Sequence, residues 1–512
     1  MSDLLREPRL GPVVGHVTDA SARVWIRGAD VDRMRTVGVG GLVAANGKVD
    51  PSTVQYFRLH REYDRTGFAD FKKLAAGKLY AAKLGSIAVD STAPDLNVSD
   101  AEIKALLPPA GRWAPQLDEL DPAAAGASFS TFSAAAAPEI SFLFGSCRYP
   151  DILPLQKRAD RVFGAMAEQA AAQPTDFALM VGDQIYADLF NRAIPIGRAD
   201  TAREFHERYA EAWSSRNFRR LLQRLPTYMI LDDHEIEDNW DQTRIATERG
   251  RTLFQLAVMA YRSYQWLPGP RNFGDLLYYT FECGGFPFFV TDGRTQRVRR
   301  EPESDDEKRL LPDNHLLGYP QKGSYVGQID RLCAWLVQQQ KAVGSRPKFI
   351  VSASVFAPNG VEARRRPWKD DAWAAFPQTR MQLLRTIVER DVENVVFLSG
   401  DIHVSNVCEI WFEDANEDRG DLRAYSITSS AFYWPFPFAD GEPGAYVHDS
   451  KREKDGFQFE TSAGPRVMHY AARGFQQADN FTRVTVRPDR IGVGTFDSKG
   501  DALDGGAHTF EL

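Results

Sequence analysis

The stretch ISFLFGSCR, residues 140–148, decides the fold, because an apolar run typical of a buried strand leads directly into a polar cluster, GSCR. The same pattern recurs three times: DFALMV runs into GDQIY (Gly182–Tyr186), YMIL into DDHE (Asp232–Glu235) and VVFL into SGDIH (Ser399–His403). Open α/β sheets bind ligands at the carboxyl ends of their strands. Carboxylates, a thiol, a phenol and two imidazoles at such ends predict a metal site with oxygen, nitrogen and sulfur donors, and hence a metallohydrolase.

Helical patterns alternate with strand-like runs from Glu139 onward. The spacing of apolar residues predicts helices over 201–225, 247–266, 327–340 and 378–390, and further strands at FPFFV and KFIVSA. Strands that alternate with helices indicate a layered α/β architecture. After Asp401 the chain reads mostly as strands, which predicts mixed or antiparallel additions to the sheet.

The first part of the chain lacks these polar clusters. ARVWIRG, which begins at Ala22, alternates apolar and polar residues, and glycines, prolines and aspartates separate it from other strand-like pieces. This pattern predicts a small antiparallel β-sandwich. A chain of 512 residues is expected to form two domains. Because residues 121–138 are rich in alanine and serine, we predict an N-terminal β-sandwich over 1–135 and a catalytic domain over 136–512.

Composition narrows the function. The chain is 43% apolar and 26% charged, as in ordinary globular proteins, and its net charge of −7 argues against a nucleic-acid footprint. It has no run of eighteen apolar residues, so no transmembrane segment is predicted, and it carries no signal for an oligomeric state. The start, MSDLLREPRL, lacks a signal-peptide pattern, which predicts a cytoplasmic protein, or a periplasmic or secreted one if a leader was removed.

The polar clusters suit phosphate-ester hydrolysis. A metal ion can lower the pKa of bound water from about 15.7 to about 7, and two ions can clamp the attacking and leaving oxygens. Asp183 is the candidate for a carboxylate that bridges two ions, since Gly182 permits a sharp turn. Cys147 and Tyr186 would supply thiolate and phenolate, which favour ferric iron. The other cysteines, Cys283, Cys333 and Cys408, are expected to be small core residues.

The remaining clusters supply further candidate ligands and a catalytic imidazole. Asp401 and His403 are two residues apart, so both can reach one centre from an extended chain. Asp233 is the candidate ligand of the second ion. His234 would face the substrate and assist the leaving oxygen, with Asp232 or Glu235 orienting its ring.

Arginines are the candidates for binding the phosphoryl group, because a guanidinium can grip phosphate through two hydrogen bonds. FFVTDGRTQR carries Arg294 and Arg297, and Arg148 stands beside Cys147. The two arginines of FFVTDGRTQR could instead pair with nearby acids. The aromatic run FYWPFPF, Phe432–Phe438, is expected to be packing or a crossing loop, although it would wall the pocket if it lay above the sheet edge.

These motifs, in this order, resemble those of the PhoD-like alkaline phosphatases, a branch of the metallophosphatase superfamily. LGPVVGHVTDASARVWIRG also resembles the opening strands of the family's β-sandwich domain. The resemblance implies a four-layer αββα catalytic domain. It further implies Fe(III) bound by Cys147, Asp183, Tyr186 and His403, and Ca(II), or another divalent metal, shared by Asp183, Asp401 and Asp233.

The implied activity is hydrolysis of small phosphate esters, phosphomonoesters and also phosphodiesters, by a metal-bound oxygen nucleophile. Arg294 or Arg148 would hold the phosphoryl oxygens, with Arg297 as a further substrate contact, and His234 would assist the leaving group. Two alternatives stay open. One is a phosphodiesterase or phospholipase D-like enzyme on the same site, and the other is a catalytically silent sensor of phosphate ligands.

Overall fold

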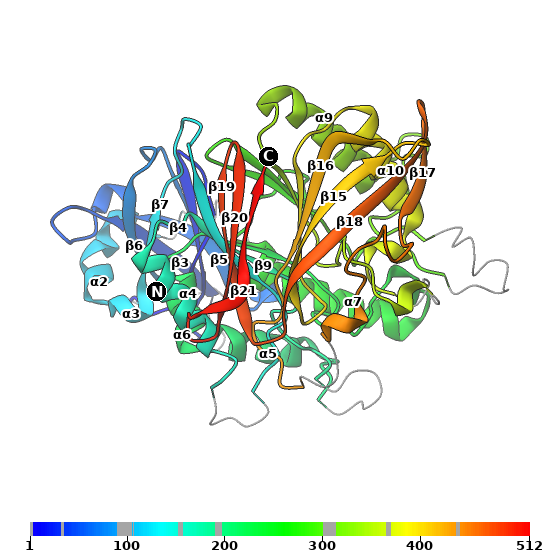
Figure 1. The fold of residues 1–512 in the computed structure, drawn as a ribbon. Helices are drawn as coiled ribbons and strands as arrows, with labels where there is room; N and C mark the ends of the chain where they lie inside the picture. Colours follow the sequence, from blue (N-terminus) through cyan, green and yellow to red (C-terminus); the bar gives the residue numbers. More distant parts are fainter. Residues whose placement is uncertain are drawn as a thin grey trace.

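The computed structural model describes residues 4–31, 35–89, 105, 107–151, 157–189, 197–300, 314–364, 370–436 and 441–512. Two large mixed sheets dominate the chain after residue 139 (Figure 1). The first has six strands in the order β10-β9-β8-β19-β20-β21. Their bounds are β8 (Ile140–Gly145), β9 (Phe177–Val181), β10 (Thr227–Ile230), β19 (Asn480–Arg487), β20 (Arg490–Asp497) and β21 (Ala502–Glu511).

The second sheet has eight strands in the order β11-β12-β13-β14-β16-β15-β18-β17. Strands β8, β9 and β10 of the first sheet are parallel, as are β12, β13, β14 and β16 of the second. The later strands join antiparallel, as predicted for the C-terminal part. The bounds are β11 (Tyr279–Cys283), β12 (Phe286–Val290), β13 (Lys348–Val351), β14 (Val395–Ser399), β15 (Ser405–Glu413), β16 (Arg419–Thr428), β17 (Phe457–Thr461) and β18 (Gly464–Gln476).

Alternation along the strands puts the two sheets face to face. Phe142 on β8 turns inward and lies 5.7 Å, ring to ring, from Phe288 on the other sheet, which stacks on Phe349 at 4.5 Å. The neighbouring Leu143 turns outward and packs with helices. Successive side chains of a strand point to opposite faces, so one apolar run can serve both a sheet–sheet core and a sheet–helix core.

Helices cover the outer faces of both sheets. On the first sheet the outer core includes residues of α4 (Arg161–Ala172), α5 (Ala202–Ser214), α6 (Arg216–Leu222) and α7 (Glu248–Tyr261). On the second sheet it includes residues of α9 (Gln328–Val343) and α10 (Pro377–Glu389). The order helix, sheet, sheet, helix confirms the predicted α/β class and agrees with four layers.

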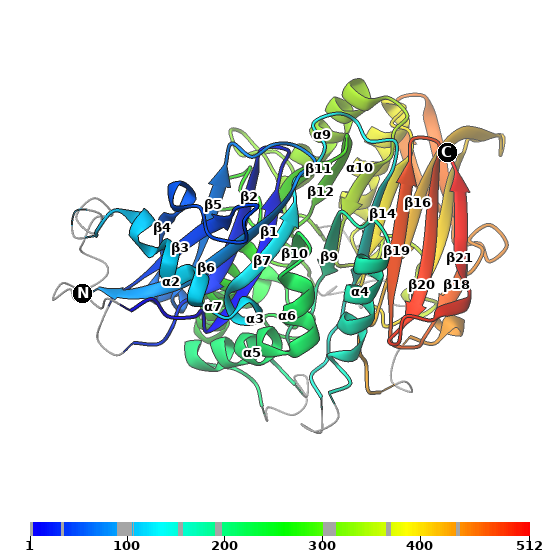
Figure 2. The ribbon, with the colours of Figure 1, turned by 90° about the vertical axis from the view of Figure 1, so that its left-hand side faces the viewer.

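The N-terminal part forms two small antiparallel sheets at one end of the molecule (blue in Figure 2). One contains β1 (Leu10–Val17), β2 (Ser21–Arg27) and β5 (Thr66–Lys72). The other contains β3 (Arg35–Val43), β4 (Gln55–Arg58), β6 (Leu79–Val89) and β7 (Gly126–Ser130), with α2 (Ala114–Glu119) and α3 (Pro122–Ala125) beside it.

The N-terminal sheets share a core with the rest of the chain. Val14 and Val24 belong to the same apolar cluster as Phe142 and Phe288. Trp25 Nε1 donates to the Ser263 carbonyl at 2.9 Å. The division at residue 135 therefore stays a prediction.

One predicted helix is interrupted. The expected helix over 201–225 ends as α5 and restarts as α6, because Ser215 between them has an extended backbone. The Asp160 carboxylate accepts hydrogen bonds from the Asn217 and Phe218 amides at 2.9 Å, which caps the second helix. Among the described residues, no helix combines the length and the apolar character needed to cross a bilayer.

Candidate metal centre

Strand exits from both large sheets meet at one pocket of about 450 Å³. The exits of β9, β10 and β14 contribute most of its polar side chains, and a later loop contributes aromatic ones. The residues that line it are Tyr149, Asp183, Tyr186, Leu189, Asp233, His234, Asp238, Asn239, Asp371, Asp401, Ile402, His403, Trp434, Phe436 and Tyr446.

The backbone at the candidate ligands is held in an unusual conformation. Cys147, Asp183, Asp401 and His403 have φ angles of 59°, 55°, 73° and 52°. Residues other than glycine seldom adopt this left-handed region, and such outliers cluster at functional sites. The turns thus aim four side chains from three separate exits toward a common region.

Glycines allow these turns to approach one another. Gly182 has a φ of 94°, and a Cβ there would meet the Asp232 Cβ at 2.5 Å. A Cβ at Gly400 would lie 2.4 Å from Ser146 Oγ. Side chains at these positions would push the strand exits apart, so both glycines serve the assembly of the site.

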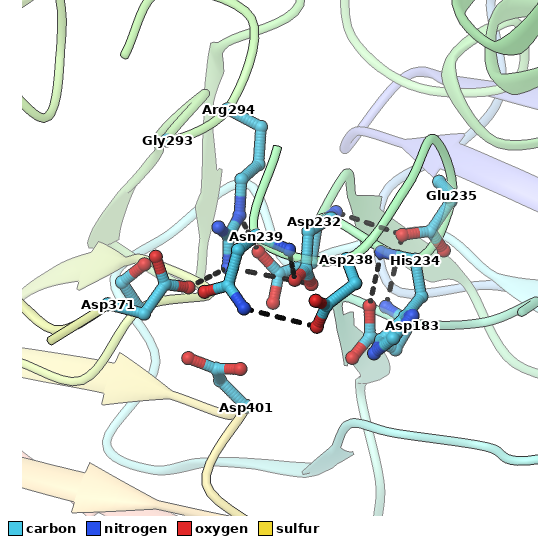
Figure 3. A network of polar contacts seen from close by, with 12 residues as sticks. Asp183, Asp232, His234, Glu235, Asp238, Asn239, Gly293, Arg294, Asp371 and Asp401 are labelled. Atoms are coloured by element: carbon cyan, nitrogen blue, oxygen red, sulfur yellow. Dashed lines mark hydrogen bonds and ion pairs between the residues drawn. The ribbon is translucent and has the colours of Figure 1, made fainter. Parts of the chain in front are cut away.

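A compact acidic cluster contributes three carboxylates, Asp183, Asp233 and Asp401, to the pocket lining (Figure 3). One carboxylate oxygen from each of Asp183, Asp232, Asp233 and Asp401 lies within 4.8 Å of the others. Burial, together with the neighbouring carboxylates, raises the pKa of both Asp183 and Asp401 well above the usual value. Buried Asp232 Oδ2 and Asp233 Oδ1 also have no hydrogen-bond partner. Buried acceptors without donors are costly, and a bound cation would satisfy them.

A thiol and a phenol adjoin this cluster. Cys147 Sγ is buried and lies 3.5 Å from Asp183 Oδ2 and 3.7 Å from the Asp401 carbonyl. The Tyr186 hydroxyl is buried with no hydrogen-bond partner. Burial first, then neighbouring negative groups, raises the pKa of both the thiol and the phenol. A multivalent cation would reverse these shifts, because it stabilises the deprotonated donors.

His403 completes the donors around the pocket. Its ring stacks on Trp434 with centroids 3.8 Å apart, and its backbone amide donates to Ser430 Oγ at 3.1 Å. All six predicted ligands lie in or beside this pocket, and the oxygens of Asp183, Asp233 and Asp401, within the acidic cluster, are suited to a metal ion.

His234 is oriented by a residue that sequence reasoning missed. Its Nδ1 lies 2.7 Å from Asp188 Oδ1, and its ring stacks on Tyr186 with centroids 4.3 Å apart. Burial lowers the pKa of His234, but Asp188, Asp233 and Asp183 outweigh it and raise that pKa well above the usual value.

The expectation that Asp232 or Glu235 orients His234 is wrong. Glu235 instead accepts hydrogen bonds from the backbone amides of Asp232, Asp183 and Gln184 at 2.9, 3.1 and 2.7 Å. One buried carboxylate thereby ties the β9 exit to the β10 exit. Asp232 pairs with Arg294.

Arg294 lies beside the cluster but is fully buried. Its Nε and Nη2 bond to Asp232 and Asp371, and Nη2 also lies 3.5 Å from Asp233 Oδ1 (Figure 3). The guanidinium offsets the repulsion among these carboxylates. It does not line the pocket. Its contacts are with acidic side chains, the alternative that the sequence left open, and not with the space where substrate was predicted to bind.

Arg297 and Arg148 are also absent from the pocket lining. Arg297 bonds to Asp371, Ser354 Oγ and the Gly293 carbonyl. Arg148 points away, toward the break between α5 and α6. It donates to the Ala212 carbonyl at 3.0 Å and to Ser215 Oγ at 2.6 Å. Both arginines are bound to internal partners, and their predicted contacts with substrate stay predictions.

Two acids near the centre were missed for different reasons. Asp188 follows Tyr186 by two residues, so the longer motif GDQIYAD contained a signal for it. Asp371 lines the pocket and pairs with Arg294, Arg297 and Arg299, but no apolar strand precedes it. The loop that carries it gives no pattern in sequence.

Aromatic side chains form one wall of the pocket. The ring of Tyr149 lies 5.4 Å from those of Trp434 and Phe436, and all three line the pocket. The run that begins at Phe432 thus both packs and walls the site. Its last two residues, Pro437 and Phe438, lie outside the described part of the chain.

Comparisons with known proteins agree with this geometry. Alkaline phosphatase D of Bacillus subtilis (strain 168) is 23% identical over 294 residues, which are 52% of this chain and 46% of that protein. The chain thus aligns with about half the length of this curated relative. A solved structure described as "Structure of PhoD" matches 100% of this chain and 92% of its own, with a TM-score of 0.65 at 16% identity, which shows a shared fold.

A family model described as PhoD-like phosphatase matches residues 144–455, which run from the end of β8 past the aromatic wall. This range is more than half of the chain and contains all six predicted ligands. The chain belongs to the PhoD-like phosphatase family.

Proposed function

We propose that this protein is a metal-dependent phosphoester hydrolase whose substrate is a small phosphomonoester. The observation that carries the proposal is the buried group of Asp183, Asp232, Asp233 and Asp401, with oxygens that lack donors at the base of an open pocket. Arg294 supplies one positive charge beside these four carboxylates, and oxygens at such spacing are suited to cations that in turn bind phosphate oxygens.

The donors fall into two sets that share Asp183. Cys147, Tyr186 and His403 would hold Fe(III) with Asp183, because thiolate and phenolate stabilise a trivalent ion. Asp233 and Asp401, all-oxygen donors, would hold Ca(II) or another divalent ion with Asp183. When bound, the ions would activate water and neutralise charge on the phosphoryl group.

His234 is the group placed to serve the leaving oxygen. It lines the pocket, and Asp188 at its Nδ1 fixes the ring so that Nε2 is available to a substrate. The Asp188 carboxylate raises the pKa of His234, which favours a protonated ring that could donate to the departing oxygen. Arg294 acts indirectly, by holding Asp232 and Asp371 in place.

The aromatic wall favours a second candidate, a phosphodiesterase. A diester carries a second organic group, and the exposed faces of Trp434 and Phe436 would pack against it. This substrate class shares the metal site with the first and differs only in how much of the pocket it fills.

The test is elemental analysis of the protein purified without added metal, together with phosphate release from chromogenic mono- and diesters. Asp183→Asn should reduce both bound metal and hydrolysis by at least about tenfold. Asp176 offers a matched control, since it is a largely buried carboxyl at the other end of β9, and Asp176→Asn should retain both. A fully metal-loaded protein that hydrolyses no ester would leave a phosphate sensor as the better description.

A further inference from the structure

A second concave surface lies away from the metal pocket, between α6 and the N-terminal strands. It encloses about 740 Å³ and shares no lining residue with the metal pocket. Small residues of β6, β7 and α3, such as Ala81, Ala123 and Gly126, form one side. Figure 2 shows α6 close to α3 and β7, and the Ser128 amide donates to the Gln223 carbonyl at 2.9 Å. We call this surface the α6 groove.

The α6 groove is strongly basic. Arg216, Arg220 and Arg224 repeat every four residues, so they follow one face of α6 and the turn after it. All three are exposed, and the structure gives none of their side chains a hydrogen bond or ion pair with any described residue. No Asp or Glu is among the described residues that line the groove. Like charges at this spacing repel, and nothing in the groove compensates them.

Two other basic residues have a structural task there. Arg219 donates to the Gly11 and Ala124 carbonyls at 2.9 and 2.7 Å, and Lys83 Nζ donates to the Asp118 and Leu120 carbonyls at 2.7 and 3.0 Å. These bonds attach α6 and β6 to neighbouring segments. The groove therefore has fixed walls, and the three guanidinium groups, which have no partner among the described residues, stand on a positioned helix and the turn that follows it.

The spacing of the charges indicates a ligand with several negative groups in a row. A helix rises about 1.5 Å per residue, so Arg216 and Arg220 are separated by about 6 Å along the axis of α6, and Arg224 continues the row just past the end of the helix. One phosphate could reach only one of them in a bidentate contact. A linear chain of phosphates could contact all three.

The residues that line the groove indicate which linear polyanion it suits, a single-stranded nucleic acid or a phosphate chain without bases. Proteins that bind single-stranded nucleic acid pair a basic track with aromatic side chains on which the bases stack. The described residues that line the α6 groove include no aromatic side chain, and several are alanine or glycine. Such a surface suits a phosphate chain without bases.

We propose that the α6 groove binds a linear inorganic polyphosphate through Arg216, Arg220 and Arg224. The site is separate from the metal pocket and does not depend on phosphoester hydrolysis by this protein. The protein as a whole carries a net charge of −7, whereas this groove is basic. A polyanion would therefore concentrate at the groove and not elsewhere on the surface.

The test is isothermal titration of the full chain with medium-length sodium polyphosphate, in buffer without added divalent metal. The groove variant is Arg216→Ala/Arg220→Ala/Arg224→Ala. The control is Arg203→Ala/Arg452→Ala/Arg490→Ala, which removes the same charge from exposed arginines outside the groove. We expect the groove variant to bind about tenfold or more weakly, with a shallower salt dependence, and the control to bind within about twofold of the unmodified protein.

Hydrolysis of a chromogenic monoester, measured in parallel, should be the same in both variants, since none of these arginines lines the metal pocket. Because binding is read without turnover, a failure of the groove and a failure of the proposed hydrolase are distinguishable. The proposal is overturned if the unmodified protein does not bind polyphosphate, or if both variants lose affinity equally. It is also overturned if a single-stranded thymidine oligonucleotide binds the groove as tightly as polyphosphate.

Discussion

His234 Nδ1 lies 2.7 Å from Asp188 Oδ1, although the two residues are 46 positions apart in sequence and follow different strands. Asp188 also accepts the Asp238 amide at 2.7 Å, so one buried carboxylate fixes both the imidazole and the loop that follows it. This pairing makes His234 an oriented side chain in the pocket, because the other ring nitrogen is left to face a ligand.

Asp188→Asn should lower kcat/KM for a monoester by about 10- to 100-fold, the range found when residues that orient catalytic groups near metals are replaced. Since Asp188 raises the pKa of His234, its loss should lower that pKa and move the alkaline limb of the pH–rate profile to lower pH. Glu62→Gln, which alters a similar pair with His60 outside the pocket, is the control. An unchanged profile in Asp188→Asn would show that His234 has no part in turnover.

Tyr186→Phe tests the iron proposal. Loss of the phenolate should remove visible absorption that arises from tyrosinate and Fe(III), and should lower iron content and hydrolysis together. Compared without bound metal, the variant and the unmodified protein should differ in stability by no more than roughly 1 kcal/mol, because the Tyr186 hydroxyl has no hydrogen-bond partner to lose.

Tyr149→Phe is the matched control for Tyr186→Phe, since Tyr149 lines the same pocket with its ring 4.9 Å from that of Tyr186. Its hydroxyl donates to the Leu189 carbonyl. The measurements are the iron content and the visible absorption spectrum of the two variants. If Tyr186→Phe keeps the iron and the spectrum, Tyr186 is not a ligand.

Arg148→Met distinguishes a structural arginine from a substrate contact. Arg148 joins β8 to the α5–α6 break and lies 5.0 and 4.7 Å from the rings of Phe163 and Phe218. Its loss should destabilise the fold by about 2–4 kcal/mol, measured by chemical denaturation, because buried hydrogen bonds and ring contacts disappear. KM for a monoester should stay within about twofold. A large rise in KM without loss of stability would restore the sequence-based prediction.

The strand framework could be predicted because each core strand is an apolar run that ends in a polar cluster. Phe142 and Leu143 show why the runs are continuous, since they serve opposite faces of a sheet that is covered on both sides. The interrupted helix at Ser215 could not be predicted, because its cause is the capping carboxylate of Asp160, which is remote in sequence. Local periodicity contains no information about such a partner.

The candidate ligands could be named because each directly follows a strand, where parallel topology sets its position. The roles of the arginines could not, because a guanidinium beside a strand exit can turn toward substrate or toward the core. Arg294 meets Asp371, which lies 77 positions further along the chain, and that encounter depends on the tertiary fold alone. Residues whose partners are distant in sequence are therefore the ones whose contacts could not be predicted from the sequence.

Phe436→Ala tests whether the aromatic wall selects the organic part of the substrate. Phe436 lies 5.3 Å from Trp434, ring to ring, and it lines the pocket. The substitution should lower kcat/KM for an aryl diester by about three- to tenfold through lost ring contact, and leave a small alkyl monoester within about twofold. Phe457→Ala, at a partly buried ring that neither lines the pocket nor contacts its lining aromatics, should change neither rate. Equal effects on both esters would argue against a role in selecting the diester.

His16 should make the stability of the protein depend on pH. Burial, with a contribution from Arg23, lowers the pKa of His16 from 6.5 to about 4, and its Nδ1 lies 3.2 Å from the Tyr228 hydroxyl. The unfolded chain binds a proton below about pH 6.5, whereas the folded protein resists it until about pH 4. The free energy of unfolding should thus fall by on the order of 2–3 kcal/mol across this window on acidification.

Denaturant titrations at intermediate pH values measure this loss. His16→Gln should reduce it, whereas His448→Gln, at an exposed site, should retain it. An identical pH dependence in His16→Gln and the unmodified protein would mean that other groups, such as the acidic cluster, account for acid sensitivity.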